Sequence, residues 1–287
     1  MANTKITNPE LFNLGDSTSA TQLPIMTTTQ RTAMTGLSDG EMIFNSTTDK
    51  VEYWDGTKWY GITYEVQVPP VLATSTLYLD ASDTTSYPGT GSTWFDISGN
   101  SHNGSISGPT FNTGGWFDSV ATNNQISIAN SSVFSSQTFS AGGWYYPASP
   151  SSGGGWIFTK GGAGNYEYAS YATAGNAGSV SFTTYYQGGA GSTVVMNSGN
   201  MTLSTWFHVI VTVDFSNQSA KLYVNGGTPK GTDTSFIAHT TGSNPLLIGK
   251  RADQNTTSWP GRYSKFNFWT NKILTQAEVQ SLYDYGP

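Results

Sequence analysis

The sequence predicts an all-β fold, a sandwich or barrel of many short strands. Aromatic residues make up 14% of the chain, and glycine is abundant, with 33 residues. Aromatic and β-branched side chains suit a pleated, half-buried surface, whereas glycine and asparagine suit tight turns. Strand-like runs alternate with turn clusters, which is typical of a sandwich or barrel. The runs are 76–79, 125–129, 138–146, 155–159, 180–186, 193–196, 206–214, 220–225, 245–248 and 261–269.

The run 206–214 also indicates which of its faces is buried. Successive side chains of a strand point to opposite faces, and one of the two sets here is entirely apolar. We predict that this apolar set points into the core. On the other face we interpret His208 as a packed structural residue rather than a base or a ligand. The predicted core set is Phe207, Val209, Val211 and Val213.

One short helix is predicted at the C-terminus. Thr275 and Glu278 have the spacing of a capping box, in which each side chain bonds the other residue's backbone N–H. Leu274 and Val279 occupy the two positions of a hydrophobic staple around that cap, and Gly286 provides the stop signal. The helix should therefore close the β domain.

The N-terminal part differs from the rest in composition. Eight of the eighteen acidic residues lie before residue 70, where Pro69 and Pro70 enforce an extended path. We therefore predict an N-terminal module over 1–65, a proline-containing linker over 66–74 and a β-sandwich over 75–287.

The N-terminal module itself reads as a small β-meander with an extended arm. We expect an extended path over 1–24, a helical turn over 29–34, and short strands over 41–45, 50–54 and 58–62. Three such strands are too few to bury a core of their own. The module is therefore expected to pack against copies of itself or against another protein.

Charge and composition exclude several classes of protein. The formal net charge is -6 and no basic cluster is present, so nucleic acid is not an expected partner. The chain has no cysteine, which excludes disulfides, thiol nucleophiles and thiolate metal sites. No long apolar stretch or apolar N-terminal signal occurs, so we expect synthesis in the cytoplasm and no membrane insertion.

Five segments of the C-terminal part resemble, in order and spacing, the second half of a concanavalin A-like lectin/glucanase domain of the laminin-G-like kind. Upstream segments resemble that family's opening strand and first turn, so the resemblance covers about 75–287 and implies a jelly-roll β-sandwich. Residues 117–126 depart from the pattern, because relatives often carry a glycine after the aspartate and an Asp-Tyr pair there. The five segments are 206–214, 221–226, 247–249, 261–269 and 274–283, and the upstream ones are 77–83, 94–99 and 102–104.

A second resemblance lies at the N-terminus. Residues 23–31, 40–45, 48–50 and 53–59 resemble a short module of tailed-bacteriophage tail-fibre and capsid-fibre proteins. The two resemblances together imply a virion-located fibre, spike or capsid decoration protein, with a homotrimer and contacts to other virion proteins through 1–65. They leave tail and capsid positions open. A free bacterial carbohydrate-binding module or adhesin is the alternative, and a glycanase is a weaker one.

The residue pattern favours a non-enzymatic protein with no catalytic residues. Glycoside hydrolysis usually needs two carboxyl groups facing each other across the bond. After residue 70 the only glutamates are Glu167 and Glu278, and no strand carries paired carboxylates at alternate positions. His102, His208 and His239 are not accompanied by the motif of a nucleophile elbow, so a catalytic triad is not predicted either.

Two kinds of binding site remain as predictions. The family resemblance implies that calcium, the one cofactor considered, would bind oxygen ligands at a rim, although ordinary turns explain the same residues. Sugar binding needs an aromatic platform beside hydrogen-bonding groups, and aromatic residues cluster around glycine-rich stretches near 153–164. The calcium candidates are Asp80, Asp83, Asp96 and Asn100, and the candidates for a host-surface glycan are Trp156, Tyr166, Tyr168, Tyr185 and Trp259.

Overall fold

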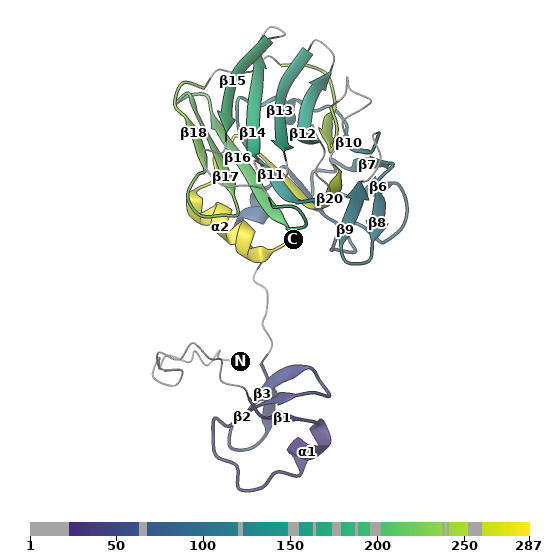
Figure 1. Ribbon diagram of the computed structural model, residues 1–287, viewed down its shortest axis with the longest axis vertical. Helices are drawn as coiled ribbons and strands as arrows, with labels where there is room; N and C mark the ends of the chain where they lie inside the picture. The colour runs from purple at the N-terminus through teal and green to yellow at the C-terminus, as the bar shows by residue number, and fades with distance from the viewer. Residues whose placement is uncertain are drawn as a thin grey trace. The chain divides into compact units, whose positions relative to one another are not determined.

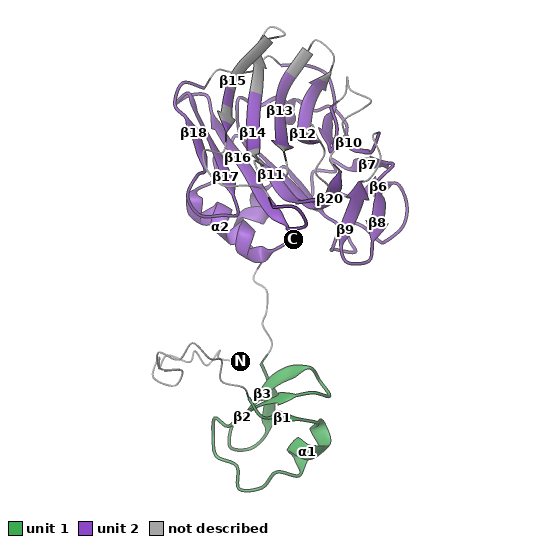
Figure 2. Ribbon diagram, in the orientation of Figure 1, with its two compact units in different colours: residues 1–66 green, residues 67–287 purple. Residues whose placement is uncertain are grey.

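The computed structural model divides the chain into two compact units, Met1–Val66 and Gln67–Pro287 (Figure 2). We call them the N-terminal unit and the C-terminal unit and describe each by itself. The predicted extended arm over 1–24 lies almost entirely outside the described residues. The structure describes residues 23–62, 68–119, 123–148, 155–162, 165–173, 179–186, 189–195, 202–236, 239, 241–251 and 260–287.

The N-terminal unit is a four-stranded sheet with one short helix. The helix α1 (Thr28–Thr32) follows β1 (Ile25–Met26), and its cap Thr27 forms a capping box with Gln30. The strand order is β1-β2-β3-β4, with β1 parallel to β2 and the other pairs antiparallel. The three predicted strands and the helical turn are confirmed, whereas β1 was not predicted. The remaining strands are β2 (Met42–Asn45), β3 (Lys50–Trp54) and β4 (Trp59–Gly61).

The C-terminal unit consists of two antiparallel sheets, which we call sheet I and sheet II (Figure 1). Sheet I has the order β15-β14-β13-β12-β19-β10-β7-β6. Its strands are β6 (Thr93–Trp94), β7 (Gly104–Ser107), β10 (Gln125–Ile128), β12 (Gly155–Gly162), β13 (Asn165–Thr173), β14 (Ser179–Tyr186), β15 (Gly189–Val195) and β19 (Leu246–Ile248).

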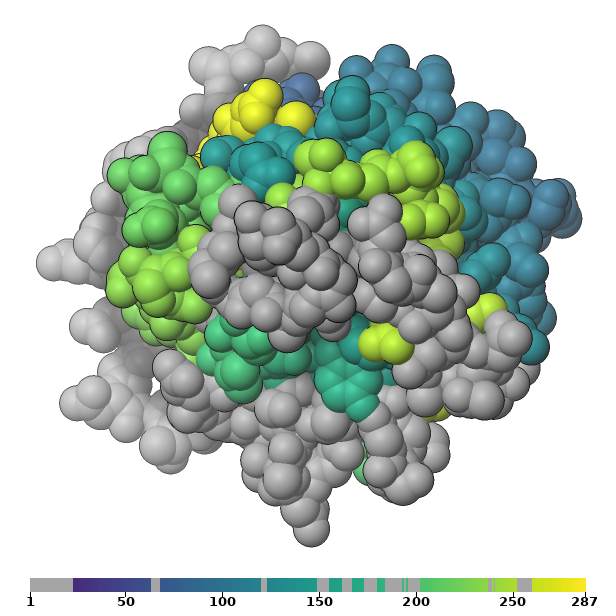
Figure 3. All heavy atoms as spheres, turned by 90° about the horizontal axis from the view of Figure 1, so that it is seen from above, coloured from purple at the N-terminus to yellow at the C-terminus, as the bar shows by residue number. Residues whose placement is uncertain are grey.

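Sheet II has the order β18-β17-β16-β11-β20-β9-β8, and β5 also pairs with β20. In Figure 3 the green residues of β16–β18 and the blue residues that include β8 lie on opposite sides, in agreement with this order. The strands of sheet II are β5 (Leu77–Asp80), β8 (Thr110–Asn112), β9 (Trp116–Ser119), β11 (Thr138–Pro147), β16 (Phe207–Asp214), β17 (Ser219–Val224), β18 (Gly231–Asp233) and β20 (Gly261–Thr270).

The main core lies between the two sheets and is rich in aromatic rings. Phe139 of β11 stacks on Phe268 of β20, with ring centroids 5.0 Å apart, and contacts Tyr168 of β13. The predicted core face of β16 is confirmed, because all four of its members belong to this cluster. Burial of many such rings supplies the main driving force for folding.

The other face of β16 is also buried: His208 is packed there, as interpreted from the sequence, whereas the burial of Ile210 and Thr212 was not predicted. Ile210 of this face joins a second cluster on the outside of sheet II, together with Trp269 of β20 and Val279 and Leu282 of α2 (Gln276–Tyr285). A 3-10 helix over Pro70–Thr74 completes the cover. The C-terminal helix and its capping box are as predicted. No helix among the residues described is long and apolar enough to cross a membrane.

Candidate functional site

Beyond the part that α2 covers, the outer face of sheet II carries a row of aromatic and charged side chains. Tyr146 of β11 pairs in register with Arg262 of β20, which pairs with Asp118 of β9. Trp206 precedes β16 beside the same end of β11, because Tyr145 pairs with Phe207. Four neighbouring strands thus bring together residues that are far apart in the sequence. Their buried neighbours in sequence, which fix the outward direction of the row, are Phe117, Tyr145, Phe207 and Tyr263.

The side chains of this row hold one another in place. The guanidinium carbon of Arg262 lies 4.5 Å from the ring centre of Tyr146 and 4.9 Å from that of Trp116. Its Nε donates to Asp118 Oδ1 at 2.9 Å, and Trp116 Nε1 donates to Asp118 Oδ2 at 3.3 Å. Trp206 meets the rings of Tyr146 and Trp116 edge-on. We call these five residues the outer aromatic cluster.

The outer aromatic cluster has the chemistry of a sugar platform. Aromatic surfaces can pack against the apolar face of a pyranose, while neighbouring polar groups fix its orientation. The side chains of Arg262 and Asp118 are 31% and 28% exposed, so a ligand can reach both. A guanidinium donates and a carboxylate accepts hydrogen bonds, which suits adjacent sugar hydroxyls. Mutual packing preorganises the groups, which reduces the entropy lost on binding.

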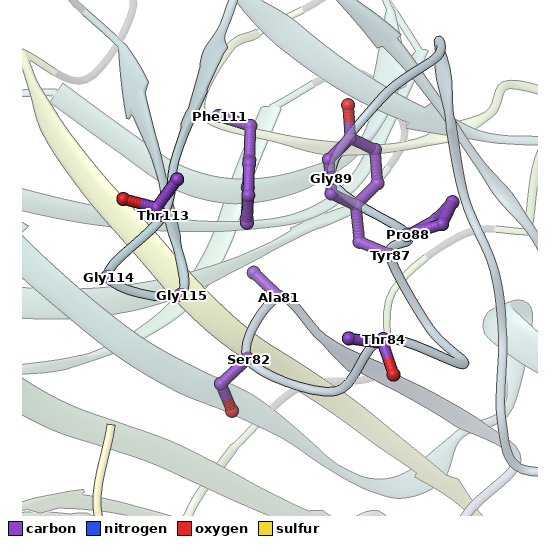
Figure 4. Close-up of a pocket in the computed structure, with 10 residues that line it drawn as sticks. All are labelled: Ala81, Ser82, Thr84, Tyr87, Pro88, Gly89, Phe111, Thr113, Gly114 and Gly115. Atoms are coloured by element: carbon purple, nitrogen blue, oxygen red, sulfur yellow. The ribbon is translucent and has the colours of Figure 1, made fainter.

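A cavity of about 270 Å³ lies at the turn that leads into β9 (Figure 4). Figure 4 shows the rings of Tyr87 and Phe111 as its apolar walls, with the hydroxyl-bearing side chains of Ser82, Thr84 and Thr113 around it. The two ring centroids are 4.7 Å apart. Its lining continues to the residue before Trp116, so the cavity adjoins β9, which carries part of the outer aromatic cluster.

The structure separates Trp156 from Tyr168, two of the five residues predicted from sequence to bind a glycan. Trp156 is half-buried on β12 and packs on Tyr171, with ring centroids 4.8 Å apart, beside the Arg251 guanidinium. Tyr168 is a correction: it is completely buried, and its hydroxyl donates to the Phe134 carbonyl at 2.7 Å. A core ring cannot form part of a surface platform. The side chains of Tyr166 and Tyr185, and all of Trp259, lie outside the described residues.

Sequence reasoning missed the outer aromatic cluster, although a signal for part of it existed. Tyr146, Trp206 and Arg262 all lie at or next to the ends of predicted strands, in positions that alternate with core residues. Alternation shows that these side chains point outward. It does not show that the strand ends meet, because that depends on the order of strands in the sheet.

The calcium candidates are engaged in turns and ion pairs. Asp83 and Asp96 each accept hydrogen bonds from the backbone N–H two residues on, as turn-forming aspartates do. Asp80 is buried, with its Oδ2 3.7 Å from Lys265 Nζ, and Asn100 donates to backbone carbonyls. No group of three or more Asp, Glu, His or Cys among the described residues is placed to hold a metal ion. Calcium binding stays a prediction.

Glu167, the glutamate that a glycanase hypothesis would use, is enclosed in the protein. Its Oε1 lies 2.9 Å from Lys160 Nζ, and its Oε2 lies 3.6 Å from His239 Nδ1. The side chains of all three residues are completely buried. Glu278, in turn, caps α2 and pairs with Lys272. A buried carboxylate neutralised by a lysine is poorly placed to reach a glycosidic bond.

The fold is that of a lectin-like β-sandwich protein. Residues 118–280 match the family described as the concanavalin A-like lectin/glucanases superfamily. This match spans more than half of the chain, which therefore belongs to that superfamily. Residues 3–86 match a phage tail-like trimerisation region. Both resemblances noted in the sequence are thus confirmed, and no curated protein matches the chain.

Solved structures share the β-sandwich at low identity. The botulinum neurotoxin serotype D binding domain is 14% identical, with a TM-score of 0.56 over 74% of this chain and 52% of that chain. The serotype D ligand binding domain in complex with N-acetylneuraminic acid is 15% identical, with a TM-score of 0.56 over 74% of this chain and 51% of that chain. A third structure is domain 4 of AbnA, a GH43 extracellular arabinanase from Geobacillus stearothermophilus, in complex with arabinotriose. It is 17% identical, with a TM-score of 0.53 over 73% of this chain and 98% of that chain. The chain thus spans about half of the neurotoxin chains, and these similarities confirm the fold class.

Proposed function

We propose that this protein is a non-enzymatic structural protein of a phage virion, a trimeric fibre, spike or capsid decoration protein whose sandwich binds a host-surface glycan. The observation that carries the proposal is the presence, in one chain, of a phage tail-like trimerisation region and a lectin-like sandwich. In this arrangement residues 1–65 assemble the trimer and contact other virion proteins, residues 66–74 act as a linker, and residues 75–287 face outward.

We assign glycan binding to the outer aromatic cluster. This surface combines three aromatic side chains with a partly exposed Arg262–Asp118 pair that offers both a donor and an acceptor. The structures of two proteins with the same fold hold carbohydrate ligands, arabinotriose and N-acetylneuraminic acid, which supports a carbohydrate as the ligand class here. A rim site that includes Trp156 is the competing location.

A glycan array with the full-length protein tests this assignment. Trp206→Ala should weaken binding about tenfold or more, because it removes an aromatic surface that would contact the sugar, and tenfold corresponds to about 1.4 kcal/mol. Trp156→Ala is the matched control at the competing location and should bind as the unmodified protein does. The reverse pattern would place the site beside Trp156. An array without any bound glycan would contradict the lectin-like role.

The virion role needs a separate measurement. Electron microscopy of purified phage particles, with antibody against the C-terminal unit, should show labelled projections at a tail or capsid position. The alternative function is a free bacterial carbohydrate-binding module or adhesin. The similarity to domain 4 of the extracellular arabinanase favours this alternative, because this chain covers 98% of that domain. Particles free of this protein, combined with glycan binding, would support that alternative.

A further inference from the structure

One face of the N-terminal sheet is formed by apolar and aromatic side chains, and the ammonium of Lys58, just before β4, lies 4.7 Å from the centre of the Tyr60 ring. Across the strands, Ile25 pairs with Phe44, which pairs with Val51, and Met42 pairs with Tyr53, which pairs with Tyr60. Residues paired in register point to the same side of a sheet, and so do residues two apart on one strand. We call this set the apolar sheet face. It consists of Ile25, Met42, Phe44, Val51, Tyr53, Tyr60 and Ile62.

Four of the seven residues of the apolar sheet face are exposed in the single chain. Ile25 is 58% exposed, Ile62 44%, Tyr60 38% and Tyr53 37%. These four are half of the eight large hydrophobic residues that are exposed in the described part of the chain. Tyr53 and Tyr60 also stack on each other, with ring centroids 5.6 Å apart. Exposed apolar residues concentrated on one small surface mark an interaction site.

The opposite face of the same sheet mixes polar and apolar residues, and its buried polar part contacts α1. Glu52 forms an ion pair with Arg31 of α1 and accepts hydrogen bonds from Asn45 and Thr48. Burial by itself would raise the pKa of Glu52, but the hydrogen bonds from these three partners lower it overall. Ile43 is the single buried apolar side chain in the described part of this unit. Two of the three buried residues in the described part of this unit are therefore polar, Asn45 and Glu52.

So small a buried core cannot supply the burial that an independent domain needs. Hydrophobic stabilisation scales with the apolar area removed from water, and here one apolar side chain among the described residues is buried whereas four large ones stay exposed. A four-stranded sheet of this size also needs a covered hydrophobic face for stability. The missing cover must come from outside the residues described in the N-terminal unit.

We propose that the apolar sheet face is the contact through which three copies of this chain assemble. Two observations select a further copy as the occupant. The matched trimerisation region, residues 3–86, contains every strand of this sheet. In addition, none of the seven residues is charged, and Lys58, whose ammonium contacts the Tyr60 ring, has a long side chain that can keep its charge in water while identical faces pack on one another. The inference rests on the trimer of the proposed function and adds the surface that forms it.

Sedimentation of the full-length chain tests the proposal. The unmodified 30.7 kDa chain should sediment with the mass of three chains. The double variant Tyr53→Asp and Tyr60→Asp should sediment as a single chain, because a trimer of this variant would bury six carboxylates. It should stay a single chain even at about 100 times the concentration at which the unmodified trimer dissociates. Phe95→Asp is the control, since Phe95 is 42% exposed and lies in the C-terminal unit. It should remain a trimer.

Crosslinking provides a second readout that does not depend on destabilising the chain. Because the protein has no cysteine, Tyr60→Cys introduces a single thiol. Mild oxidation should link pairs of chains through this thiol, whereas Phe95→Cys should give single chains. A trimer that survives both aspartates and forms no Tyr60→Cys crosslink would overturn the assigned surface while leaving the trimer intact. An unmodified chain that sediments as a monomer would overturn the trimer itself.

Discussion

Replacing Glu167 with glutamine should destabilise the C-terminal unit far more than the same change at Glu278. Lys160 and Glu167 are completely buried and 2.9 Å apart. Glutamine is nearly the same size as glutamate, so Glu167→Gln leaves the packing intact but removes the charge that compensates Lys160. Removing one partner of a buried ion pair costs about 3–5 kcal/mol, because the remaining charge stays desolvated.

The magnitude is set by what Lys160 retains. Its ammonium still donates to Asn130 Oδ1 at 2.7 Å and to the Asn244 carbonyl at 2.8 Å, so the lower half of that range is expected. Glu278 is partly exposed, and Glu278→Gln loses part of a helix cap and a surface ion pair with Lys272. Those contacts are worth about 1 kcal/mol together.

Hydrogen exchange of the full-length protein, followed by mass spectrometry, measures the difference. The slow amides of β16 report global opening of the C-terminal unit, because this strand lies in the middle of sheet II. Glu167→Gln should accelerate their exchange by about 10²-fold or more, and Glu278→Gln by about fivefold, since 1.4 kcal/mol corresponds to a factor of ten. Equal acceleration by both variants would refute the reasoning.

Two further predictions follow from buried groups of sheet II. Burial, with a smaller effect of nearby Lys265, lowers the pKa of His208 to about 3. Below pH 6.5 the unfolded chain therefore gains a proton that the folded chain does not, so stability falls between pH 6.5 and about 3. Urea unfolding at pH 7 and pH 5 gives the decrease in the free energy of unfolding between these pH values. This decrease should be about 2 kcal/mol smaller for His208→Gln than for the unmodified protein, and equal decreases would contradict the assignment. Gly142→Ala places a β-carbon 1.9 Å from the Val209 carbonyl oxygen of the paired strand. This clash should abolish soluble, folded protein. An unchanged melting temperature would show that the two strands can move apart to accept the methyl group.

Local features of the sequence determined much of the secondary structure. Alternation along 206–214 identified the core face of β16, and the Thr275–Glu278 box identified the start of α2. The three strands predicted in the N-terminal module also formed. These features depend on residues only a few positions apart, so a single sequence contains the required information.

Strands that are short or rich in turn-forming residues escaped prediction. Most have only two to four residues, too few to show a period of two. Asn165–Thr173 is longer, but it follows a glycine-rich stretch and resembles an aromatic loop in sequence. Pairing with β12 and β14 makes it a central strand and places Tyr168 in the core. The β-propensity of a segment is decided largely by its neighbours in the sheet.

Composition and alternation therefore determined that this protein is a β-sandwich with a smaller β module, whereas the order of strands decided its surfaces. Trp116, Tyr146, Trp206 and Arg262 come from four segments that meet only because β9, β20, β11 and β16 are neighbours. The uncovered apolar face of the N-terminal sheet likewise depends on register and on α1 covering the other side. Long-range pairing leaves no local pattern in the sequence, because its free energy comes from contacts between distant segments.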